Sequence, residues 1–348
     1  LSIFESESCL NTTLTNLENQ NILSKFSVIL TPNAYKASKL LSVVPKFGSA
    51  DFDVTRATSA TRINSSGVVE NIGLNVPRID YTGGGCPSIL LEPQRTNLYL
   101  NSETLVTQNI TTIATSYTVS FYGTGTITFS GTFSGTLVGT GTSNRVTLTF
   151  TTTSGTLTST VSGTVTKAQS TIGLYATSYI PALSSAVTRN SDIIIKNGIS
   201  DFIGQAQGAL FIEASSFDFN GSGFGERISL TDGSFNNRIG IDFNSNGNVT
   251  LVISSPSSTG TISSASNVVL KNTIFKIAVV YNGVNSFLAI NGVIYNTITG
   301  TIPTFSGQLN TIEFNQGNNS RPFYGNVKVL GGSKLILTQS EVIQLTTL

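Results

Sequence analysis

The stretch NRIGIDFN, residues 237–244, decides the fold class, because apolar residues alternate in it with polar or small ones. In an extended strand this alternation places Ile239, Ile241 and Phe243 on one face and the residues between them on the other. Similar short runs precede and follow it, separated by turn residues at intervals of about ten residues, which is typical of antiparallel sandwiches. The pattern predicts an all-β protein in which residues 193–348 form an antiparallel β-sandwich.

A tract rich in threonine, serine and glycine occupies residues 105–192. Within it Val146, Leu148 and Phe150 alternate with threonines, as in a half-buried strand. Disordered low-complexity segments lack this density of large apolar residues in register. The tract is therefore predicted to form a second antiparallel β-sandwich with tight turns.

The two ends of the chain carry different signals. Residues 1–40 are polar and amide-rich, and their leucines at helical spacing fit a short docking helix, an extended arm or a partly ordered terminus. Near the other end, Thr338 and Glu341 have the spacing of a capping box. That spacing predicts a short C-terminal helix.

Charge is scarce in this chain. Charged residues make up 11% of the 348 residues, against roughly 25% in average soluble proteins. The net charge of +1 provides no general field for nucleic acid or an anionic membrane, and no apolar stretch approaches the roughly 18 residues of a membrane span. The sequence has no histidine and only two cysteines, too few for a zinc cage. Nucleic-acid binding, membrane insertion and His-dependent nucleophilic catalysis are therefore not expected.

Four arginines in residues 41–104 stand out against this background. We interpret them as structural latches, whose guanidinium groups hold carboxylates and backbone carbonyls of neighbouring loops. Arg62 and Arg78 are predicted to be buried and paired with carboxylates of residues 51–92. The latch residues are Arg56, Arg62, Arg78, Arg95, Asp51, Asp53, Asp80 and Glu92. The alternative is a polar groove in which arginines bind an acidic sugar.

The same region resembles a module of bacteriophage and prophage structural proteins. The phrases that carry the resemblance are SVVP, DFDVTRATSATRINSSGVVE, NVPRIDY, CPSILLEPQRTNL and NSE, which together span residues 41–104. The resemblance implies a fibre, spike or tail-type protein on the virion surface, assembled in the bacterial host cytoplasm. It also implies that residues 1–40 attach the protein to other virion proteins.

Two further resemblances concern the sandwiches. The phrases AVVYN, LAINGV, NTIEFN, FYGNVKVL and LTQSEVIQL resemble a laminin G-like, concanavalin A-like jelly roll over residues 193–348. The phrase ATSYIP and the following AVTR are similar to phage tail and fibre proteins, where they end a carbohydrate-binding-like sandwich. Together these resemblances imply a surface that binds host glycans.

Aromatic and amide side chains near the predicted loops are the candidates for sugar contacts, because sugars stack on aromatic faces beside hydrogen-bonding groups. The candidates are Tyr281, Tyr295, Asn315, Asn318, Asn319, Arg321, Phe323 and Tyr324. The alternative for Tyr281 and Tyr295 is that they are strand residues half buried in the sandwich.

Catalysis and metal binding have weaker support in the sequence. Asp242 and Glu313 stand alone in their strands, so no pair of carboxylates can be nominated for glycoside hydrolysis. Laminin G-like domains often hold calcium, and Asp218, Asp232 and Asp242 are candidate ligands, although they lack the spacing of a known calcium loop. We expect a non-enzymatic protein without a cofactor. A polysaccharide-degrading spike and a secreted bacterial adhesin are the alternatives.

Assembly follows from the same scarcity of charge. Threonine-rich strands with few lysine or glutamate side chains leave sheet edges that need covering. A homotrimer would shelter the polar faces of residues 105–170 and fits the fibre-like resemblance. Whether Cys9 and Cys86 form a disulfide or remain thiols is left open by their number, although so few cysteines favour thiols.

Overall fold

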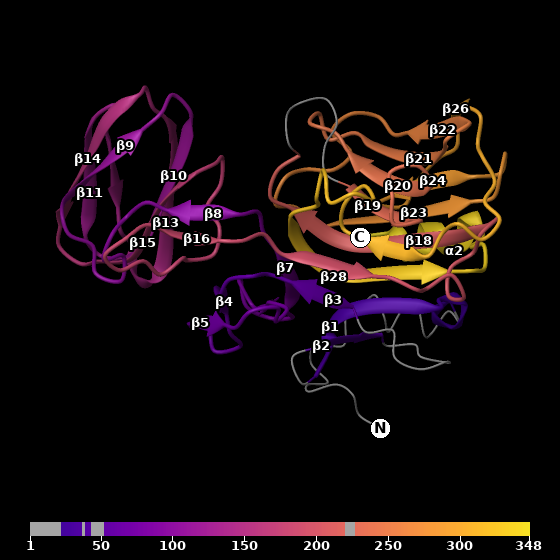
Figure 1. Cartoon of the computed structure of the whole chain (residues 1–348), viewed down its shortest axis with the longest axis horizontal. Helices are drawn as coiled ribbons and strands as arrows, with labels where there is room; N and C mark the ends of the chain where they lie inside the picture. Colours follow the sequence, from indigo (N-terminus) through magenta and orange to yellow (C-terminus); the bar gives the residue numbers. More distant parts are fainter. Residues whose placement is uncertain (1–21, 37–38, 43–51, 220–226) are drawn as a thin grey trace.

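The computed structural model describes residues 22–36, 39–42, 52–219 and 227–348. These residues form antiparallel sheets with one short α-helix near the C-terminus. Figure 1 shows a larger sandwich on the right and a smaller one on the left. The predicted all-β fold built from antiparallel sandwiches is confirmed. In the described part of the chain, no helix has the length and apolar character needed to cross a membrane.

The larger sandwich has two sheets that enclose one apolar core. The first contains, in spatial order, β2 (Lys39–Ser42), β1 (Val28–Lys36), β28 (Gly325–Ser333), β18 (Gly208–Ser216), β23 (Phe275–Tyr281), β24 (Phe287–Ile290) and β25 (Val293–Tyr295), with β7 (Ser88–Leu91) and β6 (Ile79–Asp80) joined to β28. The second contains β26 (Ile298–Gly300), β22 (Ser258–Ser263), β21 (Val249–Ser255), β20 (Arg238–Phe243), β19 (Arg227–Thr231), β27 (Thr311–Glu313), β17 (Ile193–Lys196) and β3 (Asp53–Thr55).

The alternation that predicted the fold is present in β20. Ile239, Ile241 and Phe243 are fully buried in the core between the sheets. Arg238 and Asp242 point to the opposite face of the second sheet, as the two-residue period of a strand requires. Both are nevertheless buried: Asp242 pairs with Arg227 on the neighbouring strand, and the Arg238 guanidinium lies 3.8 Å from the centre of the Phe235 ring.

A second apolar layer lies on the outer face of the first sheet. The helix α2 (Gln339–Thr346) packs there through Val342 and Leu345. The predicted capping box is confirmed, because Thr338 and Glu341 each hydrogen-bond the other's backbone N–H. Lys25, at the end of the 3₁₀ helix η2 (Leu23–Lys25), pairs with Glu341 at 2.5 Å.

Most strands from the first 91 residues belong to the larger sandwich, whereas β4 (Ala60–Ile63) and β5 (Val69–Ile72) pair only with each other. β1 pairs with β28, β7 also pairs with β28, and β3 pairs with β17. The boundaries expected at residues 40 and 104 therefore do not separate independent units, and residues 28–36 form a sheet strand instead of an arm. The remainder of the expected arm, residues 1–21, lies outside the described residues. Local sequence patterns identify strands but do not show which distant strand each one pairs with.

The smaller sandwich is an insertion into the larger one. Its sheets are β13 (Gly141–Thr151), β10 (Ser116–Gly123) and β15 (Val165–Ile172), and β12 (Gly135–Val138), β11 (Thr126–Gly131), β14 (Gly155–Ser162) and β9 (Gln108–Thr112). They enclose a separate core that includes Phe121, Phe129 and Phe150. The chain enters through β8 (Arg95–Asn97) and leaves through β16 (Val187–Arg189), and these two strands pair with each other. We call residues 98–186 the insert.

The polar face of the insert's three-stranded sheet is covered by the same chain. Thr118 Oγ1 donates to the carbonyl of Gly173 at 2.8 Å, and Gln169 Nε2 donates to the carbonyl of Thr177 at 3.2 Å. Thr118 and Gln169 are each 1% exposed. The sequence predicts that neighbouring chains of a homotrimer shelter this face. In the structure, the same chain shelters this part of it.

Candidate functional site

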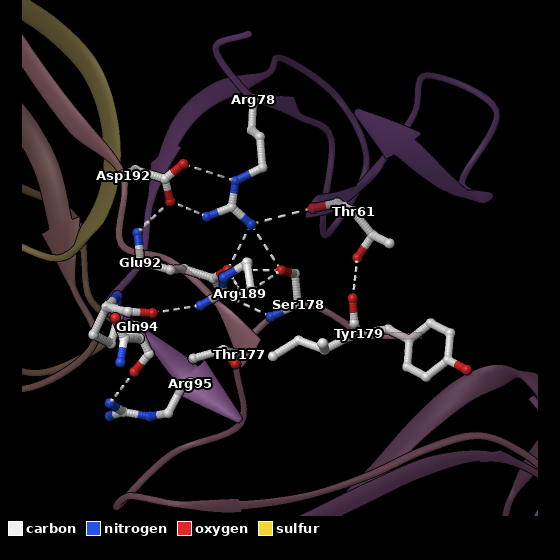
Figure 2. Close-up of polar contacts among 12 residues, drawn as sticks. Thr61, Arg78, Glu92, Gln94, Arg95, Thr177, Ser178, Tyr179, Arg189 and Asp192 are labelled. Atoms are coloured by element: carbon white, nitrogen blue, oxygen red, sulfur yellow. Dashed lines mark hydrogen bonds and ion pairs between the residues drawn. The ribbon is translucent and has the colours of Figure 1, made fainter. Parts of the chain in front are cut away.

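Five charged side chains are buried together where the insert joins the larger sandwich, and Figure 2 shows four of them, Arg78, Glu92, Arg189 and Asp192. The five are Arg56, Arg78, Arg189, Glu92 and Asp192, and none is more than 4% exposed. Glu92 and Asp192 lie just outside the two strands that lead into and out of the insert. We call these five residues the arginine cluster.

Arg78 is the centre of the arginine cluster. Its Nη1 donates to Glu92 Oε2 at 2.6 Å, to Ser178 Oγ at 2.7 Å and to the carbonyl of Thr61 at 3.1 Å. Its Nε lies 3.3 Å from Asp192 Oδ1, and its Nη2 pairs with Asp192 Oδ2. One guanidinium thereby holds the loop before the insert, the end of the insert and the segment that follows it (Figure 2).

The other two arginines complete the arginine cluster. Arg56 Nη1 pairs with Asp192 Oδ1 at 2.9 Å, and Arg189 Nη1 pairs with Glu92 Oε2 at 2.7 Å. The backbone N–H of Glu92 also donates to Asp192 Oδ2 at 2.9 Å. Three cations thus share two anions, and each carboxylate receives several charge-assisted hydrogen bonds.

Burial and charge have opposing effects on these groups. Desolvation alone would raise the pKa of Glu92, but Arg189, Arg78 and the hydrogen bond from Ser178 outweigh it and lower the pKa to about 2. Desolvation acts to lower the pKa of Arg78, yet its two carboxylate partners raise it above the ordinary value. For Arg189 desolvation prevails, and the pKa falls to about 10. All three groups are therefore charged at neutral pH.

The expected latch residues separate into two groups. Arg56, Arg78 and Glu92 meet in the arginine cluster. Arg62 does not: its side chain is 17% exposed and pairs with Glu70, which is 41% exposed, so it is not the buried latch that was predicted. Arg95 lies over the ring of Tyr175 at 5.6 Å.

The expected acidic partners differ as well. Asp80 is buried and accepts hydrogen bonds from the backbone N–H groups of Ile63 and Thr82, because it caps a turn instead of pairing with an arginine. Asp53 is exposed on β3, and Asp51 lies outside the described residues. The sequence interpretation missed Arg189 and Asp192, although both stand in the stretch VTRNSD, residues 187–192, where charges are equally scarce.

A pocket of about 190 Å³ opens beside the arginine cluster, where the loops of residues 61–92, the insert and the larger sandwich meet. We call it the junction pocket. Thr61, Asp80, Glu92, Thr177 and Tyr179 are its buried residues with polar groups. The half-buried side chains around them are Arg62, Ile63, Val69, Tyr122, Arg145, Ala176, Ser178, Phe217 and Asn326.

Two lining residues come from facing positions of the insert. Tyr122 on β10 and Arg145 on β13 are directly opposite in the antiparallel register, so their side chains leave the same face of the sheet. The larger sandwich contributes Phe217, whose ring lies 5.3 Å from that of Tyr175 with 31° between the planes. Aromatic, guanidinium and amide groups from separate parts of the chain thus converge on one hollow.

The expected glycan-binding residues are not brought together. Tyr281 and Phe323 are 3% and 1% exposed, respectively, and lie in the core of the larger sandwich, so neither is presented to a ligand. The Tyr281 hydroxyl donates to the carbonyl of Gly204 at 2.8 Å. Tyr295 is half buried on β25, and three strands of the first sheet separate β25 from β28, where the loop of residues 314–324 ends.

The loop of residues 314–324 holds the remaining candidates. Asn315, Asn319 and Tyr324 line a hollow of about 50 Å³ beside Asp192. Asn315 is buried and accepts from the backbone N–H groups of Gly317 and Asn319, so its amide serves the loop itself. The other members of the loop that were expected to bind glycan are Asn318, which is exposed, and Arg321, which is half buried.

The three aspartates considered as calcium ligands are in separate places with other partners. Asp242 pairs with Arg227 at 2.6 Å, Asp218 pairs with Lys271, and Asp232 accepts from Ser234 and Asn237. No group of three or more His, Cys, Asp or Glu side chains that could hold a metal ion occurs among the described residues. The three candidate aspartates are therefore not gathered into one calcium site. Cys86 is exposed in a loop, whereas Cys9 lies outside the described residues.

Comparisons with known proteins find similarity only among solved structures. The sequence matches no protein-family model and no curated protein. The CBM40 domain of the Ruminococcus gnavus IT-sialidase bound to α2,3-sialyllactose has a TM-score of 0.35 and 15% identity, covering 42% of this chain and 84% of that one. Domain 4 of AbnA, a GH43 extracellular arabinanase from Geobacillus stearothermophilus, in complex with arabinotriose, has a TM-score of 0.36 and 14% identity, covering 51% and 84%. At these TM-scores the likeness decides neither the fold nor the ligand of this chain.

Proposed function

We propose that this protein is a non-enzymatic phage virion protein that adheres to host or environmental glycans, and that the junction pocket is its glycan site. The observation that carries the binding role is the composition of the pocket. Tyr122 and Phe217 offer aromatic surface, and Arg62, Asp80 and Asn326 offer hydrogen-bonding groups around the same hollow. Ligand sites combine apolar or aromatic walls with a few placed polar groups in this way.

The arginine cluster supports this proposal, because it holds the walls of the pocket in place. Glu92 belongs to both the arginine cluster and the pocket lining, and both Glu92 and the lining residue Ser178 accept hydrogen bonds from Arg78. A pocket whose walls are fixed before binding loses less conformational entropy when a ligand enters. The insert would therefore act as one rigid wall of the site.

The glycan site is tested by binding measurements on purified protein with host surface polysaccharide and a panel of oligosaccharides. We expect Tyr122→Ala to reduce affinity about fivefold or more, because stacking of a sugar on an aromatic ring is worth on the order of 1 kcal/mol or more. Tyr324→Ala is the matched control, since Tyr324 lies in the alternative loop of residues 314–324. Loss of binding in the control with retention in Tyr122→Ala would place the site at that loop. Unchanged thermal unfolding of both variants is required.

The virion role rests on the resemblance of residues 41–104 to phage structural proteins. Under this proposal residues 1–40 contact other virion proteins, the protein is a homotrimer, and it is displayed on the virion surface. Mass spectrometry of purified virions and the native mass of the protein in solution test these points. New reducing ends after incubation with host polysaccharide would favour the polysaccharide-degrading spike, and absence from virions would favour the secreted adhesin.

A further inference from the structure

Arg145 lines the junction pocket without a carboxylate partner, unlike the three arginines of the arginine cluster and Arg62. Its Nη2 donates to Ser120 Oγ at 2.7 Å, and its Nε is buried without a hydrogen-bond partner. Among the described residues, no Asp or Glu oxygen forms an ion pair with it. By contrast, Arg62, which lines the same pocket, pairs with Glu70 at 2.9 Å.

The two carboxylates that line the junction pocket are already engaged. Glu92 accepts from Arg78, Arg189 and Ser178. Asp80 accepts from two backbone N–H groups and so contributes to the loop that carries it. Neither group is placed to neutralise Arg145, and the arginine cluster behind the pocket itself holds three cations against two anions.

Arg145 is half buried, and its Nε is withdrawn from water without a partner; such partial desolvation of a charge is costly, and one hydrogen bond to a neutral hydroxyl offsets little of that cost. Desolvation accordingly lowers the pKa of Arg145, with only weak compensation from Tyr122 and Glu92. Charged side chains in a cleft whose pKa is shifted by desolvation are typical of functional sites. The missing partner is then an anion that arrives with the ligand.

We infer that Arg145 binds the carboxylate of an acidic sugar residue in the junction pocket. The planar guanidinium matches a carboxylate through two parallel hydrogen bonds, a geometry that a lysine cannot provide. Tyr122 stands directly across the strand pair from Arg145, so its ring lies beside the sugar that carries the carboxylate. This inference rests on the proposed glycan-binding function and names its substrate class as carboxylated glycans.

The test compares each acidic oligosaccharide with its own carboxyl-reduced form, in which the carboxylate has become a primary alcohol. The probes are oligosaccharides that contain hexuronic or sialic acid, a sulfated neutral oligosaccharide, and unmodified neutral oligosaccharides. For the wild-type protein we expect affinity for at least one acidic probe to fall at least tenfold after carboxyl reduction. Hydrogen bonds to charged groups of this kind correspond to roughly a tenfold to hundredfold change.

Three variants connect that loss to Arg145. Arg145→Gln should lower affinity for the acidic probe by the same factor and leave affinity for the reduced probe unchanged. Arg145→Lys should retain part of the affinity, because it keeps the charge and loses the planar fork. Lys167→Gln is the matched control, because it removes a positive charge from the insert outside the junction pocket, where Lys167 pairs with Glu103, and it should change affinity by less than about threefold.

The outcomes separate this inference from the proposed function. Equal affinity for acidic and reduced probes, or full affinity in a folded Arg145→Gln variant, overturns the carboxylate assignment, and so does binding that follows sulfate instead. If neutral oligosaccharides bind and Tyr122→Ala abolishes that binding, the glycan site stands without the acidic specificity. If no probe and no host polysaccharide binds, the proposed function itself is overturned. Thermal unfolding of each variant shows that the fold is intact.

Discussion

Arg78 and Asp192 are 114 positions apart in the chain, yet they form a two-pronged ion pair in the buried interior. The pair joins the segment before the insert to the segment that resumes the larger sandwich after it. Because both side chains are buried, neither charge can be solvated if its partner is removed. The pair therefore holds the segment before the insert against the segment after it, at the base of the insert.

Truncation of this pair should be strongly destabilising. We expect Arg78→Ala to reduce the free energy of unfolding by about 3 to 5 kcal/mol, because it leaves Asp192 and Glu92 buried with fewer counter-charges. Arg62→Ala is the control, since its pair with Glu70 is partly exposed and should be worth less than about 1 kcal/mol. Urea unfolding of both variants provides the measurement. Similar losses in the two variants would contradict a special role for the arginine cluster.

The arginine cluster also predicts how stability depends on pH. The folded-state pKa of Glu92 is lowered from 4.5 to about 2, so its contribution is fully present above the unfolded pKa. That contribution is lost as the pH falls from about 5 towards 2, because the unfolded chain takes up the proton first. The shift corresponds to a contribution on the order of 3 kcal/mol.

Glu92→Gln provides the comparison for this pH dependence. Between pH 7 and pH 2 the free energy of unfolding of the wild type should fall more steeply than that of the variant, and the two curves should converge at the acid end. Urea unfolding at intervals across this range gives both curves. Parallel curves would mean that Glu92 is not held ionised by Arg78 and Arg189.

Local features of this fold could be predicted from the sequence, because they depend on neighbours along the chain. The alternation in residues 237–244 and the spacing of Thr338 and Glu341 each identified an element that the structure contains. Pairings between distant strands have no such local signal. The sequence therefore did not indicate that β7, which precedes the insert, and β17, which follows it, belong to the same sandwich.

The candidate site was harder to predict for a related reason. Phe323 and Tyr281 are aromatic residues near loops, but whether such a residue faces a core or a surface depends on tertiary packing. Arg145 and Tyr122 were missed because they lie in a low-complexity tract that was interpreted only for its strands. The sequence does contain one indication. Arg145 is the one arginine between Arg95 and Arg189, and an isolated arginine in a tract of threonine, serine and glycine is a candidate for a specific role.

The insert should be removable without loss of the larger sandwich. The cores of the two sandwiches share no residue, and no residue from 98–186 belongs to either apolar layer of the larger one. Asn97 and Val187 face each other in the β8–β16 register, so a two-residue Asn-Gly turn can replace residues 98–186. We expect a soluble variant with a strand-type circular dichroism spectrum and a cooperative unfolding transition.

The shortened variant should be less stable than the whole protein but not unfolded. It loses Ser178, which donates to Glu92 Oε2 at 2.7 Å, while the pairs of Arg78 and Arg189 with Glu92 remain. Removal of such a hydrogen bond typically costs about 1 to 3 kcal/mol. The variant should also lose glycan binding, because Tyr122 and Arg145 leave with the insert. An aggregated or non-cooperatively unfolding product would show that the larger sandwich depends on the insert for its fold.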